Sequence, residues 1–146
     1  MKVLLPDGAA PSADPIFDIL TKYKTIAVVG LSSNPSRPSY GVTEYLQSSG
    51  YHIIPVNPNE TDVLGEPSYA SLDEVPQKIE IVDIFRRPEE IPPVVDAAIR
   101  VGAKVVWMQL GIANEPAAEK ARAAGITVVM DACIFVEHKK RRQQWS

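Results

Sequence analysis

The sequence contains little of what disulfide, metal or triad chemistry requires. Among its 146 residues there is one cysteine, Cys133, and there are two histidines, His52 and His138. One cysteine cannot form an intramolecular disulfide, and such usage is typical of a reducing compartment. The histidines are far apart, and no acidic pair with a polarising partner accompanies them. We therefore predict no metal site and no catalytic constellation of the Ser-His-Asp or Cys-His kind.

Long apolar runs are also missing. The N-terminus has an apolar run of three residues before Pro6, which is too short for a signal peptide. No stretch approaches the ~20 apolar residues that span a bilayer. A net charge of −3 and a pI of about 5.4 exclude a domain that binds duplex DNA by neutralising phosphates over its whole surface. We expect a cytoplasmic protein without a membrane or nucleic-acid partner.

The composition and periodicity that are present indicate an α/β domain. An apolar content of 45% and a charged content of 23% are ordinary for one globular domain of this length. Continuous apolar runs predict buried strands over 25–30, 52–56, 79–85, 103–111 and 126–130. Helical spacing and capping residues predict helices over 15–23, 41–50, 88–102 and 114–125. The alternation predicts a Rossmann-like, doubly wound parallel sheet of about five strands in a single three-layer α/β/α domain.

The two ends of the chain differ from this domain. Residues 1–13 are rich in Pro, Ala and Ser and show little periodicity, which predicts a flexible arm. Residues 14–138 form the predicted domain. Residues 139–146 form a basic tail, for which a solvated end is the favoured interpretation and contact with a partner is the alternative.

The segment after the first predicted strand is the strongest candidate site. In an open parallel sheet, ligands bind outside the carboxyl ends of the strands. This polar loop leads into a helix N-terminus, whose free N–H groups favour a phosphate, and its one cation can add a bidentate contact. The motif is neither G-x-G-x-x-G nor a Walker A sequence, and a plain turn capped by serines is the alternative. The candidate residues are Gly30, Leu31, Ser32, Ser33, Asn34, Arg37, Pro38, Ser39, Tyr40 and Gly41.

Val56, Asn57 and Pro58 follow at the end of the second predicted strand. An ordinary NAD site needs an acidic residue at this position to hold a ribose hydroxyl. Because Asn57 is neutral, an ordinary NAD site is disfavoured. Two interpretations stay open: Asn57 binds a ribose or base edge, or the prolines beside it make a rigid turn.

Phe85, Arg86 and Arg87 stand at the end of the third predicted strand. Two adjacent cations there can offset phosphate charge, and the neighbouring apolar side chain can flank an adenine ring. One of the two arginines is expected to face solvent or to pair with Glu89 or Glu90.

The last two strand ends carry weaker signals. Gln109 and Gly111 stand where a backbone can approach a ligand closely, whereas Trp107 is expected in the core. Cys133 follows the fifth strand. A small buried cysteine is the favoured interpretation, and a thiol that faces the ligand cleft is the alternative.

Several ordered motifs, within residues 14–138, then support a resemblance: VVGLSSNPSRPSYGV, IIPVNPNETDVLGE, DIFRRPEEIP, WMQLGI and MDAC. In these the chain resembles the stand-alone CoA-binding proteins of the YccU-like group, which are similar to the nucleotide-binding domain of the succinyl-CoA synthetase α subunit. The resemblance implies a Rossmann-like fold that binds coenzyme A or an acyl-CoA as its small-molecule ligand. It also implies that loop 30–41 holds the CoA phosphates, that segments 55–58 and 85–87 line the adenosine portion, and that turn 109–111 lies along the pantetheine path.

Two departures limit what this resemblance implies. Many relatives have Asp-Arg-Cys where this chain has Asp131, Ala132 and Cys133, so any role of that arginine is lost. Succinyl-CoA synthetase also needs a domain with a phosphorylated histidine, and neither His52 nor His138 lies in a matching motif. We therefore expect a CoA-binding protein without catalysis. The alternatives are an NAD(P)-binding oxidoreductase and a mixed disulfide between Cys133 and CoA.

Overall fold

Six strands form the central sheet of the computed structural model, which describes residues 1–145. Their order is β1-β8-β7-β6-β2-β3, with β1 antiparallel to β8 and all other neighbours parallel. The strands are β1 (Lys2–Leu4), β2 (Thr25–Val29), β3 (His52–Val56), β6 (Ile81–Ile84), β7 (Val105–Met108) and β8 (Thr127–Met130). A separate hairpin pairs β4 (Asp62–Val63) with β5 (Glu66–Pro67).

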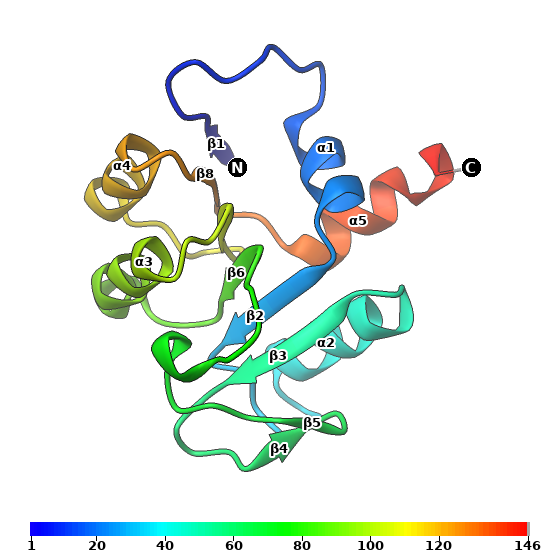
Figure 1. Ribbon diagram of the computed structural model, residues 1–146. Helices are drawn as coiled ribbons and strands as arrows, with labels where there is room; N and C mark the ends of the chain where they lie inside the picture. The colour runs from blue at the N-terminus through cyan, green and yellow to red at the C-terminus, as the bar shows by residue number, and fades with distance from the viewer. Residues whose placement is uncertain (146) are drawn as a thin grey trace.

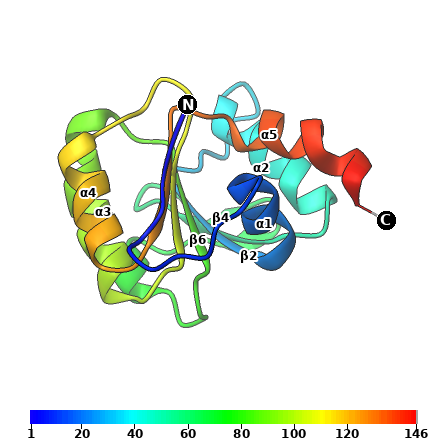
Figure 2. The same cartoon turned by 90° about the horizontal axis from the view of Figure 1, so that it is seen from above.

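Helices cover both faces of this sheet, which gives three layers (Figures 1 and 2). One face carries α3 (Ile91–Arg100) and α4 (Glu115–Ala123), and the other carries α1 (Pro15–Lys22), α2 (Pro38–Ser48) and α5 (Ile134–Arg141). Short 3-10 turns are η1 (Leu72–Glu74), η2 (Pro88–Glu90) and η3 (Arg142–Gln144). No helix within residues 1–145 is both long and apolar enough to cross a bilayer.

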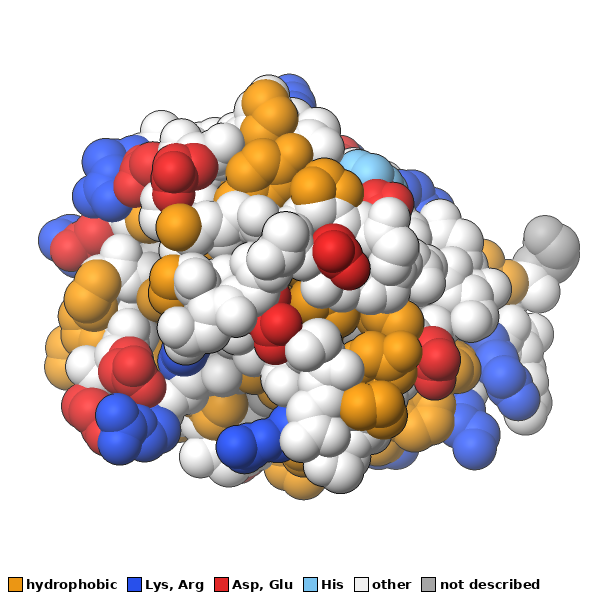
Figure 3. Space-filling model, turned by 90° about the horizontal axis from the view of Figure 1, so that it is seen from below, with side chains coloured by type: hydrophobic (Ala, Val, Ile, Leu, Met, Phe, Trp, Pro, Cys, Tyr) orange, Lys and Arg blue, Asp and Glu red, His pale blue; other side chains and the backbone are white. Residues whose placement is uncertain are grey.

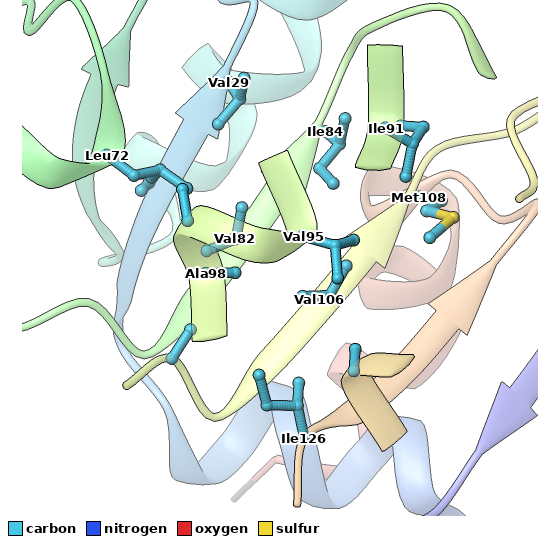
Figure 4. Close-up of a cluster of buried hydrophobic side chains, with 14 of the residues drawn as sticks. Val29, Leu72, Val82, Ile84, Ile91, Val95, Ala98, Val106, Met108 and Ile126 are labelled. Atoms are coloured by element: carbon cyan, nitrogen blue, oxygen red, sulfur yellow. The ribbon is translucent and has the colours of Figure 1, made fainter. Parts of the chain in front are cut away.

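Because both faces are covered, the parallel strands are apolar at consecutive positions. On β6, Val82 belongs to the core beneath α3, where Val95 and Ala98 pack over the sheet (Figure 4). Its neighbour Ile81 belongs to the core on the opposite face. Trp107 is fully buried in that second core, and its indole N–H donates to the Ala132 carbonyl at 2.8 Å.

The predicted fold is therefore confirmed, but both ends of the chain differ from the prediction. Lys2–Leu4 is not part of a flexible arm, because it forms a sixth strand on the open edge of β8. The predicted boundary after His138 falls inside α5, and Arg141 bonds to Asp14 at 2.8 Å instead of being solvated. Ser146, the last residue of the predicted tail, lies outside the described residues.

A further difference concerns the candidate loop after β2. Helix α2 begins at Pro38, three residues before the predicted start, so Pro38, Ser39, Tyr40 and Gly41 are helical. Proline is well suited to a first helical turn, since its missing N–H has no partner to lose there. The loop proper is therefore residues 30–37.

The order in which strands are added to the sheet reverses at β2. From β2 the chain moves outward to β3, and it then crosses back to β6 on the other side of β2. Loops that follow β2 and β6 consequently leave the sheet in opposite directions and open a crevice at its carboxyl edge. This topological switch point is where the candidate site lies.

Gly30 stands at the switch point with φ of +90°. A Cβ added there would lie 2.4 Å from the Phe85 carbonyl oxygen. This position therefore requires glycine, both for its backbone conformation and for the close approach of the two strands.

We predict that Gly30→Ala lowers the free energy of unfolding by roughly 2–4 kcal/mol, through left-handed strain plus overpacking. Gly125→Ala is the matched control, because Gly125 also has φ of +90° but has open space at its Cβ position. It should cost about 1–2 kcal/mol. Urea denaturation measures both values, and equal losses would contradict the steric argument.

Candidate functional site

A cavity of about 910 Å³ opens at the carboxyl edge of the sheet, over the switch point. Each of the five parallel strands contributes to it from the residues that follow its end. Gly30 follows β2, Asn57 follows β3, Phe85 follows β6, Gln109 follows β7, and Cys133 comes after β8. The parallel topology alone brings these residues together, since they are far apart along the chain.

Side chains inside the protein hold the shape of loop 30–37. The Asn57 amide donates to the Leu31 carbonyl at 3.0 Å, and its oxygen accepts the backbone N–H of Asn59 at 3.0 Å. The Ser39 hydroxyl accepts the Ser32 N–H at 3.1 Å. Both Asn57 and Ser39 are buried, so this bonding makes the loop a defined wall of the cavity.

Glu60 ties the same loop to the neighbouring turn. Its carboxylate accepts the Ser33 N–H at 2.8 Å, and Glu60 also lines the cavity. The N-terminus of α2 adjoins this wall. Its N-cap, Arg37, makes no side-chain capping bond within the described chain, and the first turn of α2 carries no acidic residue. An anion in the cavity can therefore use the positive end of this helix.

Three arginines from two loops line the cavity, and they differ in their bonding. Arg87 pairs with Glu90 at 3.1 Å and with Glu89 at 3.4 Å, as the sequence predicted for one of the two adjacent arginines. The Arg86 side chain lies against the Gly30 backbone, with Nε 3.3 Å from the position of an added Cβ. Arg37 is exposed at the start of α2.

The charge around the site is mixed. Arg37, Arg86 and Arg87 share the lining with Glu60 and Glu90. Figure 3, which views the molecule from below, shows basic and acidic side chains interspersed on that face. Such a mixture suits one anionic ligand held at defined contacts, because a broad field of one sign is what attracts a polyanion over a large area.

A second cavity of about 650 Å³ adjoins the first, and Asn59, Arg86 and Glu90 line both. Val56, the last residue of β3, and Pro58 line its wall, and Ala70 and Ser71 line it further along the chain. The two cavities together can hold an extended ligand with two chemically different ends.

Gln109 is a buried residue of the site, and its side-chain amide bonds to two other buried groups. Its Nε2 donates to a carboxylate oxygen of Asp83, and its Oε1 accepts the N–H of Ile134, the first residue of α5, at 3.3 Å. Asp83 is fully buried on β6. Burial raises the pKa of Asp83 to about 7, against the opposing effect of the Gln109 hydrogen bond.

A family model described as a CoA binding domain matches residues 24–139. The chain belongs to this CoA binding domain family. Protein YneT of Bacillus subtilis (strain 168) is 44% identical over 128 residues, which cover 88% of this chain and 95% of YneT. A solved structure of a hypothetical protein from Pyrococcus horikoshii OT3 is 41% identical, with a TM-score of 0.85 over 96% of this chain and 98% of that one.

Part of a larger enzyme is also similar to this chain. The ADP-forming acetate–CoA ligase II of Archaeoglobus fulgidus is 28% identical over 95 residues. That match covers 63% of this chain and 14% of the ligase. The resemblance to CoA-binding domains is thus confirmed, and membership of the CoA binding domain family supports CoA binding in general.

The structure divides the predicted site residues into three groups. Those that line the first cavity are Gly30, Ser32, Arg37, Pro38, Ser39, Asn57, Phe85, Arg86, Arg87, Gln109 and Cys133. Val56 and Pro58 line the second cavity. Those that line neither are Leu31, Ser33, Asn34, Tyr40, Gly41 and Gly111.

Packing explains two members of the third group, Leu31 and Tyr40, whereas Ser33, Asn34, Gly41 and Gly111 are exposed and line neither cavity. Leu31 is fully buried, and its neighbours are the core beneath α1, α2 and α5, where Tyr40 also packs. Gly111 donates its N–H to Asp131 at 2.7 Å.

Sequence reasoning missed several cavity residues of the CoA binding domain: Val42, Asn59, Glu60, Pro88, Glu90, Leu110 and Ile112. Most are direct neighbours of the predicted residues along the chain. Extending each strand-end motif by one or two residues would have included them. Glu90 lies three residues beyond Arg87, and neither Glu60 nor Glu90 has a side chain expected beside a phosphate.

We predict that Asp83 makes the stability of this domain depend on pH. Its pKa in the folded protein, about 7, lies above the ordinary value of 3.8, so the folded state binds more protons between these values. The free energy of unfolding should therefore fall as the pH rises from about 4 to 7, by on the order of a few kcal/mol.

Asp83→Asn removes this titration while keeping the shape of the side chain. The variant should match the wild type near pH 4 and become relatively more stable towards pH 8. Urea midpoints at a series of pH values measure the difference. Parallel curves for the two proteins would show that Asp83 does not titrate in this range.

Proposed function

We propose that this protein binds CoA, or an acyl-CoA, at the carboxyl edge of its sheet and does not transform it. The supporting observation is the cavity at the switch point, where arginines from two separate loops and the start of α2 converge. CoA carries phosphates at one end and a long uncharged arm at the other. Membership of the CoA binding domain family supports the same ligand.

The two adjoining cavities support one orientation of this ligand. The adenosine portion lies in the second cavity, between the turn at Pro58 and the segment at Arg86. The phosphates lie between Arg37 and Arg86, at the start of α2. The pantetheine arm then extends through the first cavity towards Gln109 and Cys133. Arg86 contacts both parts because it lines both cavities.

The chemistry of the lining supports binding without catalysis. Among the described residues of the first cavity, Cys133 is the one thiol, and no histidine stands beside it. His138 is occupied elsewhere, since its Nδ1 is 2.8 Å from the Tyr45 hydroxyl. A thiol without a neighbouring base lacks the usual activation of a cysteine nucleophile.

The NAD(P) alternative is not favoured. An NAD site needs an acid after the second strand to accept a ribose hydroxyl. Here that position is Asn57, whose amide donates to the Leu31 carbonyl of the loop and accepts the N–H of Asn59 in its own turn. Asn57 therefore supports the interpretation of a rigid turn that shapes the loop. A cytoplasmic location and the absence of a nucleic-acid partner remain predictions.

Calorimetric titration of the purified protein with CoA tests the proposal. At free CoA about 100 times Kd, the free energy of unfolding should rise by about 2.7 kcal/mol. NADH should give neither heat nor thermal stabilisation. The absence of any response to millimolar CoA would contradict the proposed function, and a response to NADH alone would favour the oxidoreductase alternative.

We predict that Arg37→Ala raises the Kd for CoA roughly tenfold or more, because a charge-assisted contact to phosphate is lost. Arg142→Ala is the matched control, since Arg142 is also exposed but lies in η3, after α5 and outside the lining of both cavities. It should leave the Kd unchanged. Equal effects of the two variants would mean that overall charge, and not a specific phosphate contact, governs affinity.

A further inference from the structure

Asp83 is a buried carboxyl behind the site, and no ligand contact proposed above uses it. It lies in the centre of the sheet, in register with Val28 on β2 and Trp107 on β7, and its exposure is 0%. One oxygen accepts the hydrogen bond from Gln109. The other, Oδ2, has no partner among the described residues. A buried carboxyl with an unpaired oxygen is unfavourable for folding and calls for a functional explanation.

Gln109 connects this carboxyl to the cavity. Its amide donates to Asp83 and accepts from the Ile134 N–H. A half-turn of the amide would place its oxygen against the carboxylate and its N–H groups against another donor. The two partners therefore select one orientation. Gln109 is 4% exposed and lines the first cavity, and one N–H and one lone pair of its amide have no partner among residues 1–145.

We propose that Asp83 is a positioning residue for the ligand, which acts through Gln109 to present an amide donor and acceptor to the pantetheine arm of CoA. This inference rests on the proposed function. Pantetheine contains amide groups, and a glutamine in a fixed orientation can exchange hydrogen bonds with such a group. Asp83 fixes that orientation from the interior without touching the ligand.

The surroundings of Asp83 allow its protonation to affect this contact. Its sheet neighbours Val28 and Trp107 are uncharged. Ionised Asp83 holds Gln109 by a charge-assisted hydrogen bond, which is stronger than the bond to a protonated carboxyl. On the cavity side of Gln109, the charged and titratable side chains are Arg37, Arg86, Arg87, Glu60, Glu90 and Cys133.

The test compares two ligands, CoA and adenosine 3′,5′-bisphosphate, which lacks the pantetheine arm. Asp83→Val removes the acceptor and should weaken CoA binding roughly 5- to 10-fold while leaving the bisphosphate unaffected. Asp83→Asn retains an acceptor oxygen and should keep wild-type affinity at neutral pH within about twofold. In a Gln109→Met background, Asp83→Val should cause no further loss, because the two residues act as one unit.

A pH profile gives a readout that a purely structural role would not change. Between pH 6 and 8, the ratio of CoA affinity to bisphosphate affinity should rise about threefold more for the wild type than for Asp83→Asn. Both proteins are measured with the same two ligands, so the titration of the ligand phosphates, whose second pKa is about 6, contributes equally to the two slopes. If Asp83→Val fails to fold, this comparison still decides the matter, since equal slopes for wild type and Asp83→Asn would overturn the proposal.

Thr43→Val is the matched control. Thr43 is also fully buried with an unpartnered side-chain oxygen, but it lies on α2 and has no hydrogen bond to Gln109 within the described chain. It should leave both affinities unchanged. If Asp83→Val weakened the binding of both ligands equally, or weakened neither, the proposed role of Asp83 would be overturned while the proposed function would stand. Failure of the wild type to bind CoA would instead overturn the proposed function itself.

Discussion

The close approach of β2 and β6 at their carboxyl ends is the constraint on which the site depends. Gly30 donates its N–H to the Val56 carbonyl at 2.9 Å, while Phe85 donates its own N–H to Val29 at 2.9 Å. Three strands thus end together around a residue that has no side chain. The following loops diverge from this point, and the space between them is the cavity.

The side chains that shape the cavity differ from those that offer charge to a ligand. Asn57, Ser39 and Gln109 are buried, and their hydrogen bonds go to the backbone or to Asp83. Within residues 1–145, Arg37 and Arg86 form no ion pair, whereas Arg87 pairs with Glu89 and Glu90. Because the side chains that shape the cavity form their hydrogen bonds within the protein, the arginines are available to a ligand. Preorganised recognition of an anion requires this arrangement.

The strand ends were predictable as a site because apolar runs, glycine stops and the alternation of strands with helices are local patterns. The core position of Trp107 followed from the same pattern. By contrast, Leu31 and Tyr40 stand in the polar loop motif, yet their side chains turn to the core beneath α2. A continuous motif does not show which of its side chains face the ligand. For Tyr40, that depends on the start of α2 at Pro38, which makes this residue helical.

Periodicity and composition were sufficient to predict the α/β class, a parallel sheet and the approximate helices and strands. Each of these follows from interactions between residues close in the chain. The motifs were sufficient for the family. Contacts between distant segments were decisive for the rest: the pairing of Lys2–Leu4 with β8, the bond of Arg141 to Asp14, and the pair of Asp83 and Gln109. Asp83 stands in an apolar run that reads as an ordinary strand. Its exclusion from water, and hence its raised pKa, arises only when β2 and β7 pair with β6 on either side and Gln109 bonds to its carboxylate.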